Sequence, residues 1–385
     1  MQTRFTNLVF QDGLDRIPDE ILACIFESGH DMVNHPFFSL NVSHVCRRFR
    51  DVALKTPLLW TRIHGNVNLI PTFLARSGKL DLDISFPYSS SQANDKYFNV
   101  VKLHSDRWSH LRLDYPPFSL RSRLGLLGSL PRLRFLQCLN ATSTFRLPNM
   151  PSLVHFKGDT ITLPQSPLVI CELTLYLNFD PAQLISALYQ LKNLRRLSIS
   201  FNNISAQSRV EDAPIYQPEF ALQSLFLSST SQTPSKIIPR LCSVLPFHPI
   251  SKLTVAVSGN CVKDLWMDDD DFPTESCDIL TRVLRGTGAH TISIESSVAS
   301  FIPRDATAKS ANEALWSTYA SLRKLRLKNC DELREWQVKA LADNLVSSEV
   351  GKGLQSLEIL SCENISEGFL LNLGDTMGRK LTWVL

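Results

Sequence analysis

The sequence predicts an α/β protein in which an amino-terminal helical module precedes an irregular solenoid with a parallel sheet. Two amphipathic helix patterns occur between residues 14 and 60. A strand motif with fixed leucine spacing recurs from Trp108 onward, and helix-like segments separate many of its copies. Strands that alternate with helices over short links favour right-handed crossovers and parallel pairing.

The first helix pattern has a wide apolar stripe. Pro18 fits the first helical position, where the amide that proline lacks has no partner within a helix. Asp19 and Glu20 then place negative charge at the positive end of the helix dipole. One side of this helix is therefore expected to be buried. The residues of the stripe recur at helical spacing: Leu14, Ile17, Ile21, Leu22, Ile25 and Phe26.

A second helix pattern follows a polar interval at residues 27–35. Ser43 is expected to cap its amino end, and Pro57 should stop it near Lys55. A module of about fifty residues is marginal for an independent core, so a partner or the rest of the chain should cover part of its apolar surface. The apolar side consists of Val45, Cys46, Phe49, Val52 and Ala53, and an apolar plug follows at Leu58, Leu59 and Trp60.

Four segments of this module, at residues 17–22, 25–26, 45–49 and 56–60, together resemble an F-box. An F-box is the helical module that docks receptors onto the Skp adaptor of cullin-RING ubiquitin ligases. Ile17 stands where the family often has Leu, and Phe49 where it often has Trp; both changes keep an apolar residue. An ordinary helical bundle would explain the periodicity but not the order of the four segments. The resemblance implies these docking residues: Leu14, Ile17, Pro18, Ile21, Leu22, Ile25, Phe26, Val45, Phe49 and Trp60.

The composition is that of a globular protein, with 385 residues, 44% of them hydrophobic and 20% charged. A net charge of +3 gives no general electrostatic reason to bind nucleic acid or an anionic membrane. The absence of a long apolar run and of a signal-peptide pattern predicts a cytoplasmic or nuclear protein. The nine cysteines form no CxxC pair, so we expect neither a disulfide framework nor a metal site. No cofactor is expected either.

The recurring motif is Leu-x-x-Leu-x-Leu with substitutions, in which the apolar residues should enter a core and the others should face outward. It is similar to the strand of a leucine-rich repeat. Weaker copies begin at Leu153 and Ala289, and the last two strong copies continue into Cys330 with Leu333 and Cys362 with Ile365. The strong copies begin at Trp108, Leu133, Ile170, Leu194, Leu222, Ile250, Leu322 and Leu354.

Helix-like segments lie between these copies, at residues 181–191, 235–245, 273–284, 312–319, 335–346 and 366–377. A short helix at 69–78 and a strand at 79–86 precede them, and residues 380–385 begin like a further strand. We expect an F-box at 11–62, a linker helix and first strands that cap the solenoid at 63–115, and degenerate leucine-rich repeats at 116–385. An F-box followed by such repeats resembles a class of substrate receptor that is abundant in basidiomycete fungi.

Outward residues of successive solenoid strands usually form one binding surface. Lys324, Arg326 and Lys328 alternate with leucines, so we expect them, with Arg195 and Arg196, to receive an acidic or phosphorylated client segment. A solvated strand face is the competing interpretation. The acidic run at 268–271 lacks the alternating ligands of a calcium loop and is expected to be a solvated loop.

No nucleophile elbow, phosphate-binding glycine loop, zincin signature or kinase signature occurs in the sequence. The sequence therefore favours a non-catalytic substrate adaptor of an SCF-type cullin-RING ubiquitin ligase. Its F-box would bind the Skp adaptor, and through it a cullin, while its repeats would bind a client protein. The alternative is a leucine-rich-repeat interaction scaffold that is unconnected with ubiquitin. An enzyme on an α/β scaffold is a third class, without a recognisable catalytic motif in its favour.

Overall fold

The structure is a computed structural model that forms two compact units, unit 1 at Met1–Leu153 and unit 2 at Val154–Leu385. The described residues contain thirteen strands, numbered in chain order, and parallel pairings join neighbouring strands within each unit. The model describes residues 16–33, 37–86, 91–140, 147–159, 163–164, 166–176, 181–202, 222–229, 250–257, 289–296, 322–331, 333–347 and 353–384.

Unit 1 begins with the helical module, which consists of α2 (Asp19–Met32), α3 (Phe38–Ser43), α4 (Arg47–Leu54) and the 3-10 helix η1 (Pro57–Trp60). Both predicted helices are present, and α4 ends at Leu54 with Lys55 as its C-cap, near the predicted end. Pro18 is the N-cap of α2 and not its first residue. The first helix is longer than the sequence pattern indicated, because residues 27–32 of the polar interval continue α2.

The predicted Ser43 cap is also wrong. Ser43 ends α3, a helix that the sequence pattern did not indicate, and its hydroxyl donates to the Leu40 carbonyl at 2.8 Å. Cys46 caps α4 instead, because its Sγ accepts from the Phe49 amide at 3.4 Å. A polar backbone group at a helix start needs such a partner, and the sulfur provides it here.

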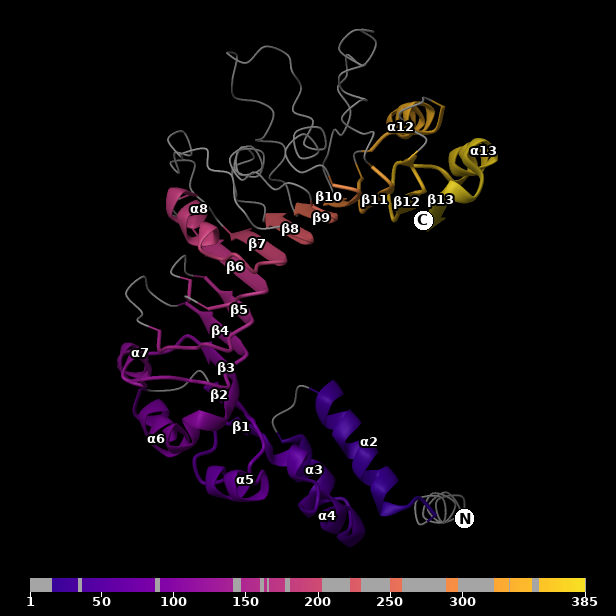
Figure 1. Cartoon of the computed structure of the whole chain (residues 1–385). Coiled ribbons are helices and arrows are strands. Elements are labelled where there is room, and N and C mark those ends of the chain that lie inside the picture. Colours follow the sequence, from indigo (N-terminus) through magenta and orange to yellow (C-terminus); the bar gives the residue numbers. More distant parts are fainter. Residues whose placement is uncertain are drawn as a thin grey trace. The chain divides into compact units, whose positions relative to one another are not determined.

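The strands of unit 1 are β1 (Arg62–His64), β2 (Leu82–Phe86), β3 (Trp108–Asp114) and β4 (Phe135–Leu139). They pair in parallel, as the crossover argument predicts. Between them lie α5 (Ile70–Arg76), α6 (Ser91–Val101), η2 (Lys102–Arg107) and α7 (Phe118–Gly125), and Figure 1 shows α5, α6 and α7 on the same side of the strands. Gly78 has a φ of 58°, a left-handed value that glycine adopts without strain, and the chain turns there between α5 and β2.

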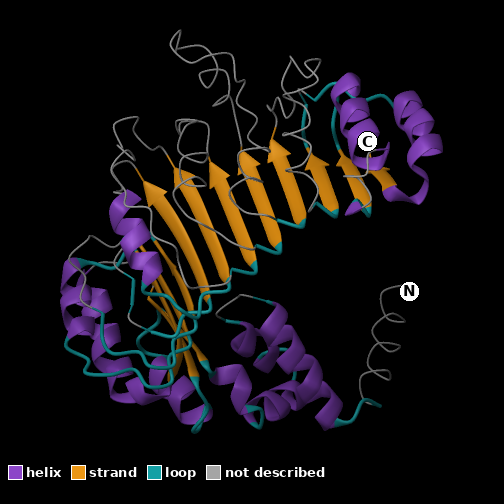
Figure 2. Cartoon of the chain, turned by 45° about the horizontal axis from the view of Figure 1, so that its top comes forward, coloured by secondary structure: helices purple, strands orange, loops and turns teal. Residues whose placement is uncertain are grey.

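Unit 2 continues the same alternation. Figure 2 shows its strands side by side with their carboxyl ends at one edge. Three α-helices are described here, α8 (Pro181–Tyr189), α12 (Glu335–Ser347) and α13 (Glu367–Met377), followed by η5 (Gly378–Lys380). The strands are β5 (His155–Gly158), β6 (Ile170–Tyr176), β7 (Arg196–Asn202), β8 (Ser224–Ser229), β9 (Lys252–Val257), β10 (Thr291–Ser296), β11 (Lys324–Lys328), β12 (Ser356–Leu360) and β13 (Leu381–Val384).

The apolar residues of the motif form the core, as predicted. In unit 2 the sheet register aligns one buried residue from each of six neighbouring strands: Leu197, Leu225, Leu253, Ile292, Leu325 and Leu357. The turn residues Cys330, Leu333, Cys362 and Ile365 are buried as well.

The motif copy predicted to begin at Ile170 begins two residues earlier. Leu168, Cys171 and Leu173 occupy its three buried positions, whereas Ile170 of β6 is half-buried and faces outward. The sheet register agrees, because Cys171 pairs with Leu197 of β7. The predicted helices at 235–245, 273–284 and 312–319 and the acidic run at 268–271 lie outside the described residues.

Candidate functional site

Helix α2 carries two rows of apolar side chains with opposite exposure. Leu22, Phe26 and His30 are spaced four residues apart and are buried. Ile21 and Ile25 form the neighbouring row, and their side chains are 50% and 51% exposed. Residues four apart lie on the same face of a helix, so the exposed row is a continuous apolar ridge. Adjacent large apolar side chains exposed to solvent on one helix face are a feature of an interaction surface.

The buried row packs against α4. The rings of Phe26 and Phe49 meet edge to face, with their centroids 5.0 Å apart. At the start of α2, Arg48 of α4 donates to the Asp19 carboxylate at 2.8 Å and to the Ile17 carbonyl. These contacts fix α2 against α4 from its first turn to its middle, so the exposed ridge is held on a rigid element.

Other predicted docking residues divide in the same way. Val45, just before α4, is 64% exposed, and Pro18 is exposed at the N-cap of α2. Ile17 and Phe49 are half-buried, and Leu14 lies outside the described residues. Leu22 and Phe26 are interior residues that support the ridge from beneath.

Trp60 is fully buried and belongs to the interior of unit 1. Its Nε1 donates to the Ala53 carbonyl at 2.8 Å, and its ring meets the Phe73 ring of α5 edge to face at 5.1 Å. The Arg76 guanidinium covers the same ring at 4.2 Å from its centroid. The indole therefore joins the helical module to the first helix of the α/β region.

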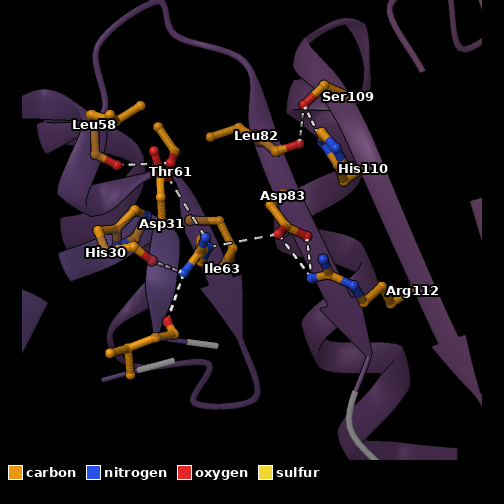
Figure 3. Close-up of polar contacts among 12 residues, drawn as sticks. His30, Asp31, Leu58, Thr61, Ile63, Leu82, Asp83, Ser109, His110 and Arg112 are labelled. Carbon is orange, nitrogen blue, oxygen red and sulfur yellow. Dashed lines mark hydrogen bonds and ion pairs between the residues drawn. The ribbon is translucent and has the colours of Figure 1, made fainter. Parts of the chain in front are cut away.

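A polar network attaches the carboxyl end of α2 to the sheet (Figure 3). Arg62 of β1 donates to the carbonyls of His30 and Val33, the latter at 2.9 Å. Such carbonyls have no partner within the helix, and a cation also suits the negative end of the helix dipole. Arg62 lies 3.9 Å from Asp83 of β2, which accepts from Arg112 of β3 at 2.8 and 2.9 Å.

His30 lies under this network and is 4% exposed. Burial, together with the positive charge of Arg62, lowers the pKa of His30 from 6.5 to about 4. The ring is therefore neutral near pH 7 and packs beside Phe38 of α3 at a centroid distance of 6.2 Å.

The cations expected to bind a client lie on the outward face of unit 2. Lys324, Arg326 and Lys328 of β11 alternate with the buried Leu325 and Leu327, so they project from one face as predicted. Arg196 of β7 is exposed on the same face by the sheet register.

Two of these cations already have partners. Arg326 contacts the carboxylate of Glu358 at 2.5 Å, and Lys328 contacts Glu295 at 2.9 Å. Sequence analysis did not find these pairs, because each joins residues about thirty positions apart on neighbouring strands. For the same reason it did not find the network of Arg62, Asp83 and Arg112.

Comparison with protein families gives one match, to the model described as F-box-like, at residues 14–66. Residues 14–66 thus contain an F-box-like domain, and F-box domains bind the Skp adaptor in SCF complexes. The exposed ridge of α2 lies inside this domain. A search among curated proteins gave no match. Within the described ranges, no helix combines the length and apolar character needed to cross a lipid bilayer.

Proposed function

We propose that this protein is a non-catalytic substrate-recognition adaptor of an SCF-type cullin-RING ubiquitin ligase. The observation that carries the proposal is the exposed ridge of Ile21 and Ile25 within the F-box-like domain. The buried row of α2 already supplies the module's own core, so the ridge is left over after folding. Covering it with a partner removes apolar surface from water, which contributes about 25 cal/mol per Å².

In this proposal the Skp adaptor covers Ile21, Ile25 and Val45, with Ile17 and Pro18 at the margin. Leu22, Phe26, Phe49 and Trp60 hold these residues in position from the interior of unit 1. The network around Arg62 then fixes α2 relative to β1. An adaptor of this kind accelerates ubiquitin transfer by proximity alone, because it holds a client near the charged enzyme.

Unit 2 is the proposed client-binding region. Parallel strands in chain order, a repeated apolar motif and buried turn cysteines support its description as a degenerate leucine-rich-repeat solenoid. The outward strand face with Arg196, Lys324, Arg326 and Lys328 is the proposed client surface. A client with acidic or phosphorylated side chains matches this charge.

Co-purification tests the first half of the proposal. Full-length protein co-expressed with the Skp adaptor should retain it, and Ile25→Asp should abolish retention, because a carboxylate in the covered ridge would be desolvated without a partner. Leu371→Asp is a matched control, since Leu371 is an apolar residue of α13 that is 54% exposed. Loss of the adaptor in both variants, or in neither, would contradict the proposal.

The alternative function is an interaction scaffold that has no link to ubiquitin. Such a protein would fold identically and would bind partners through unit 2, but it would not retain the Skp adaptor. The same co-purification therefore distinguishes the two functions.

A further inference from the structure

Exposed positive charge gathers where the strands of unit 2 begin. The two residues between the first and second buried positions of each motif copy occupy this edge. The cations at these two positions are Arg195 and Arg196 in the β7 copy, Lys252 in the β9 copy, and Arg323 and Lys324 in the β11 copy. All five cations are exposed, and among the described residues none of them forms an ion pair. We call these five residues the amino-edge stripe.

The sheet register places three of these cations in one row. Arg196 pairs with Ser224, Ser224 with Lys252, Lys252 with Thr291, and Thr291 with Lys324. Cations thus occupy alternate strands, and a hydroxyl lies on each strand between them. Neighbouring strands are about 4.8 Å apart, so successive cations of the row are about 10 Å apart.

Negative charge is absent from the same motif positions. In the six copies from β7 to β12, neither residue of the pair is a carboxylate. Glu358 lies two residues beyond this row on β12 and Glu295 four residues beyond it on β10, where they pair with Arg326 and Lys328. As far as the described residues show, the cations of the amino-edge stripe are not neutralised in this way.

Beside the stripe, the outward face of β7 to β10 carries short hydroxyl side chains together with the half-buried ring of Phe226 of β8, which lies between Ser198 and Thr254 in the sheet register. The hydroxyls can donate to acidic oxygens. The hydroxyl residues are Ser198, Ser200, Ser228, Thr254 and Ser293.

We propose that the amino-edge stripe binds an extended acidic peptide segment of the client, with an acidic side chain at every third residue. A polyproline II segment has three residues per turn and rises about 3.1 Å per residue, so every third side chain points the same way, about 9.3 Å from the last. This repeat matches the cation row. A β-strand places side chains on one face about 6.8 Å apart and fits the row poorly. The inference rests on the proposed function, because it names the chemistry of the client.

Peptide binding to the purified full-length chain tests this assignment. Two labelled peptides of about 12 residues, with equal numbers of glutamates, carry them either at every third or at every second position. Fluorescence anisotropy at low salt should show tighter binding of the every-third peptide, and added salt should weaken it. The double variant Lys252→Glu/Lys324→Glu should weaken that binding by about tenfold or more, since two attractions become repulsions.

The variant Lys102→Glu/Lys339→Glu is the matched control, because it makes the same charge change at exposed lysines on η2 and α12. Its peptide affinity should equal that of the wild type. Equal binding of the two peptides, or an equal loss in the control variant, would overturn the proposal. So would a single-stranded oligonucleotide of equal charge that binds more tightly than the peptide.

Retention of the Skp adaptor, measured with the same variants, separates this proposal from the function on which it rests. If the chain retains the adaptor but binds both peptides equally well, only the proposal that the amino-edge stripe binds the acidic segment is refuted. Peptide binding by a chain that never retains the adaptor would remove the ligase function and leave the peptide surface in place.

Discussion

At the scale of single residues, one position of sequence decides whether an α2 side chain is core or surface. Ile21 and Leu22 are neighbours, as are Ile25 and Phe26, yet only the second of each pair is buried. Successive residues of a helix are turned by about 100°, so the wide stripe in the sequence covers two faces. Periodicity predicted the stripe, but only the packing of α4 shows where the core ends.

Arg62 should stabilise the last turn of α2. In Arg62→Ala the carbonyls of His30 and Val33 lose a charged donor, and we expect a local loss of about 1–2 kcal/mol. Hydrogen exchange of the amides at 29–33 should therefore accelerate, whereas exchange in α13 should not change. Arg62→Lys keeps the charge and should show a smaller effect. Unchanged exchange in the alanine variant would show that the network does not hold the helix.

His30 should make the helical module less stable in mild acid. Its pKa is about 4 in the folded protein and 6.5 when unfolded, so the unfolded state takes up the proton first as pH falls. Stability is fully present above pH 6.5 and declines toward pH 4, by on the order of 1–2 kcal/mol at pH 5. Denaturant unfolding at pH 7 and pH 5 should show a smaller pH effect in His30→Gln. An equal pH effect in both proteins would refute this role.

At the scale of elements, the contact between α2 and α3 depends on a glycine. A Cβ added at Gly29 would lie 2.7 Å from Cζ of Phe38, so Gly29→Ala requires the ring to move. We expect Gly29→Ala to lower the melting temperature in the wild type despite the better helix propensity of alanine, which is worth about 1 kcal/mol. In the Phe38→Ala background the same change should raise it. Thermal denaturation of the wild type, the two single variants and the double variant measures the change in melting temperature in each background. A stabilising effect of Gly29→Ala in the wild type would contradict the packing argument.

Elements with a strong residue pattern were predicted from the sequence, and elements without one were missed. The strand motif placed most strands and their buried residues, because a shift of one residue would expose the whole apolar set. The copy at β6 was misplaced because Ile170 and Leu168 both offer an apolar first position. Helix α3 is too short to show helical periodicity, and the sulfur cap of Cys46 has no common sequence signal.

At the scale of the whole molecule, the alternation of strands and helices was predictable and the pairing of charges was not. Parallel order follows from short crossovers, so it needs no information beyond the sequence pattern. Which carboxylate meets Arg326 or Lys328 depends on the register between strands about thirty residues apart in sequence. The docking residues were found as a set, but the division into the exposed Ile21 and Ile25 and the interior Leu22, Phe26 and Trp60 required coordinates.

The adaptor proposal is tested most directly by calorimetric titration of the purified full-length chain with the Skp adaptor. We predict saturable binding by the wild type, and a loss of about a hundredfold in affinity for Ile21→Asp/Ile25→Asp, because both changes put charge into the covered ridge. Circular dichroism should show that the variant keeps the wild-type helix content. A folded double variant that binds as tightly as the wild type, or a wild-type chain that gives no binding signal, would contradict the adaptor function.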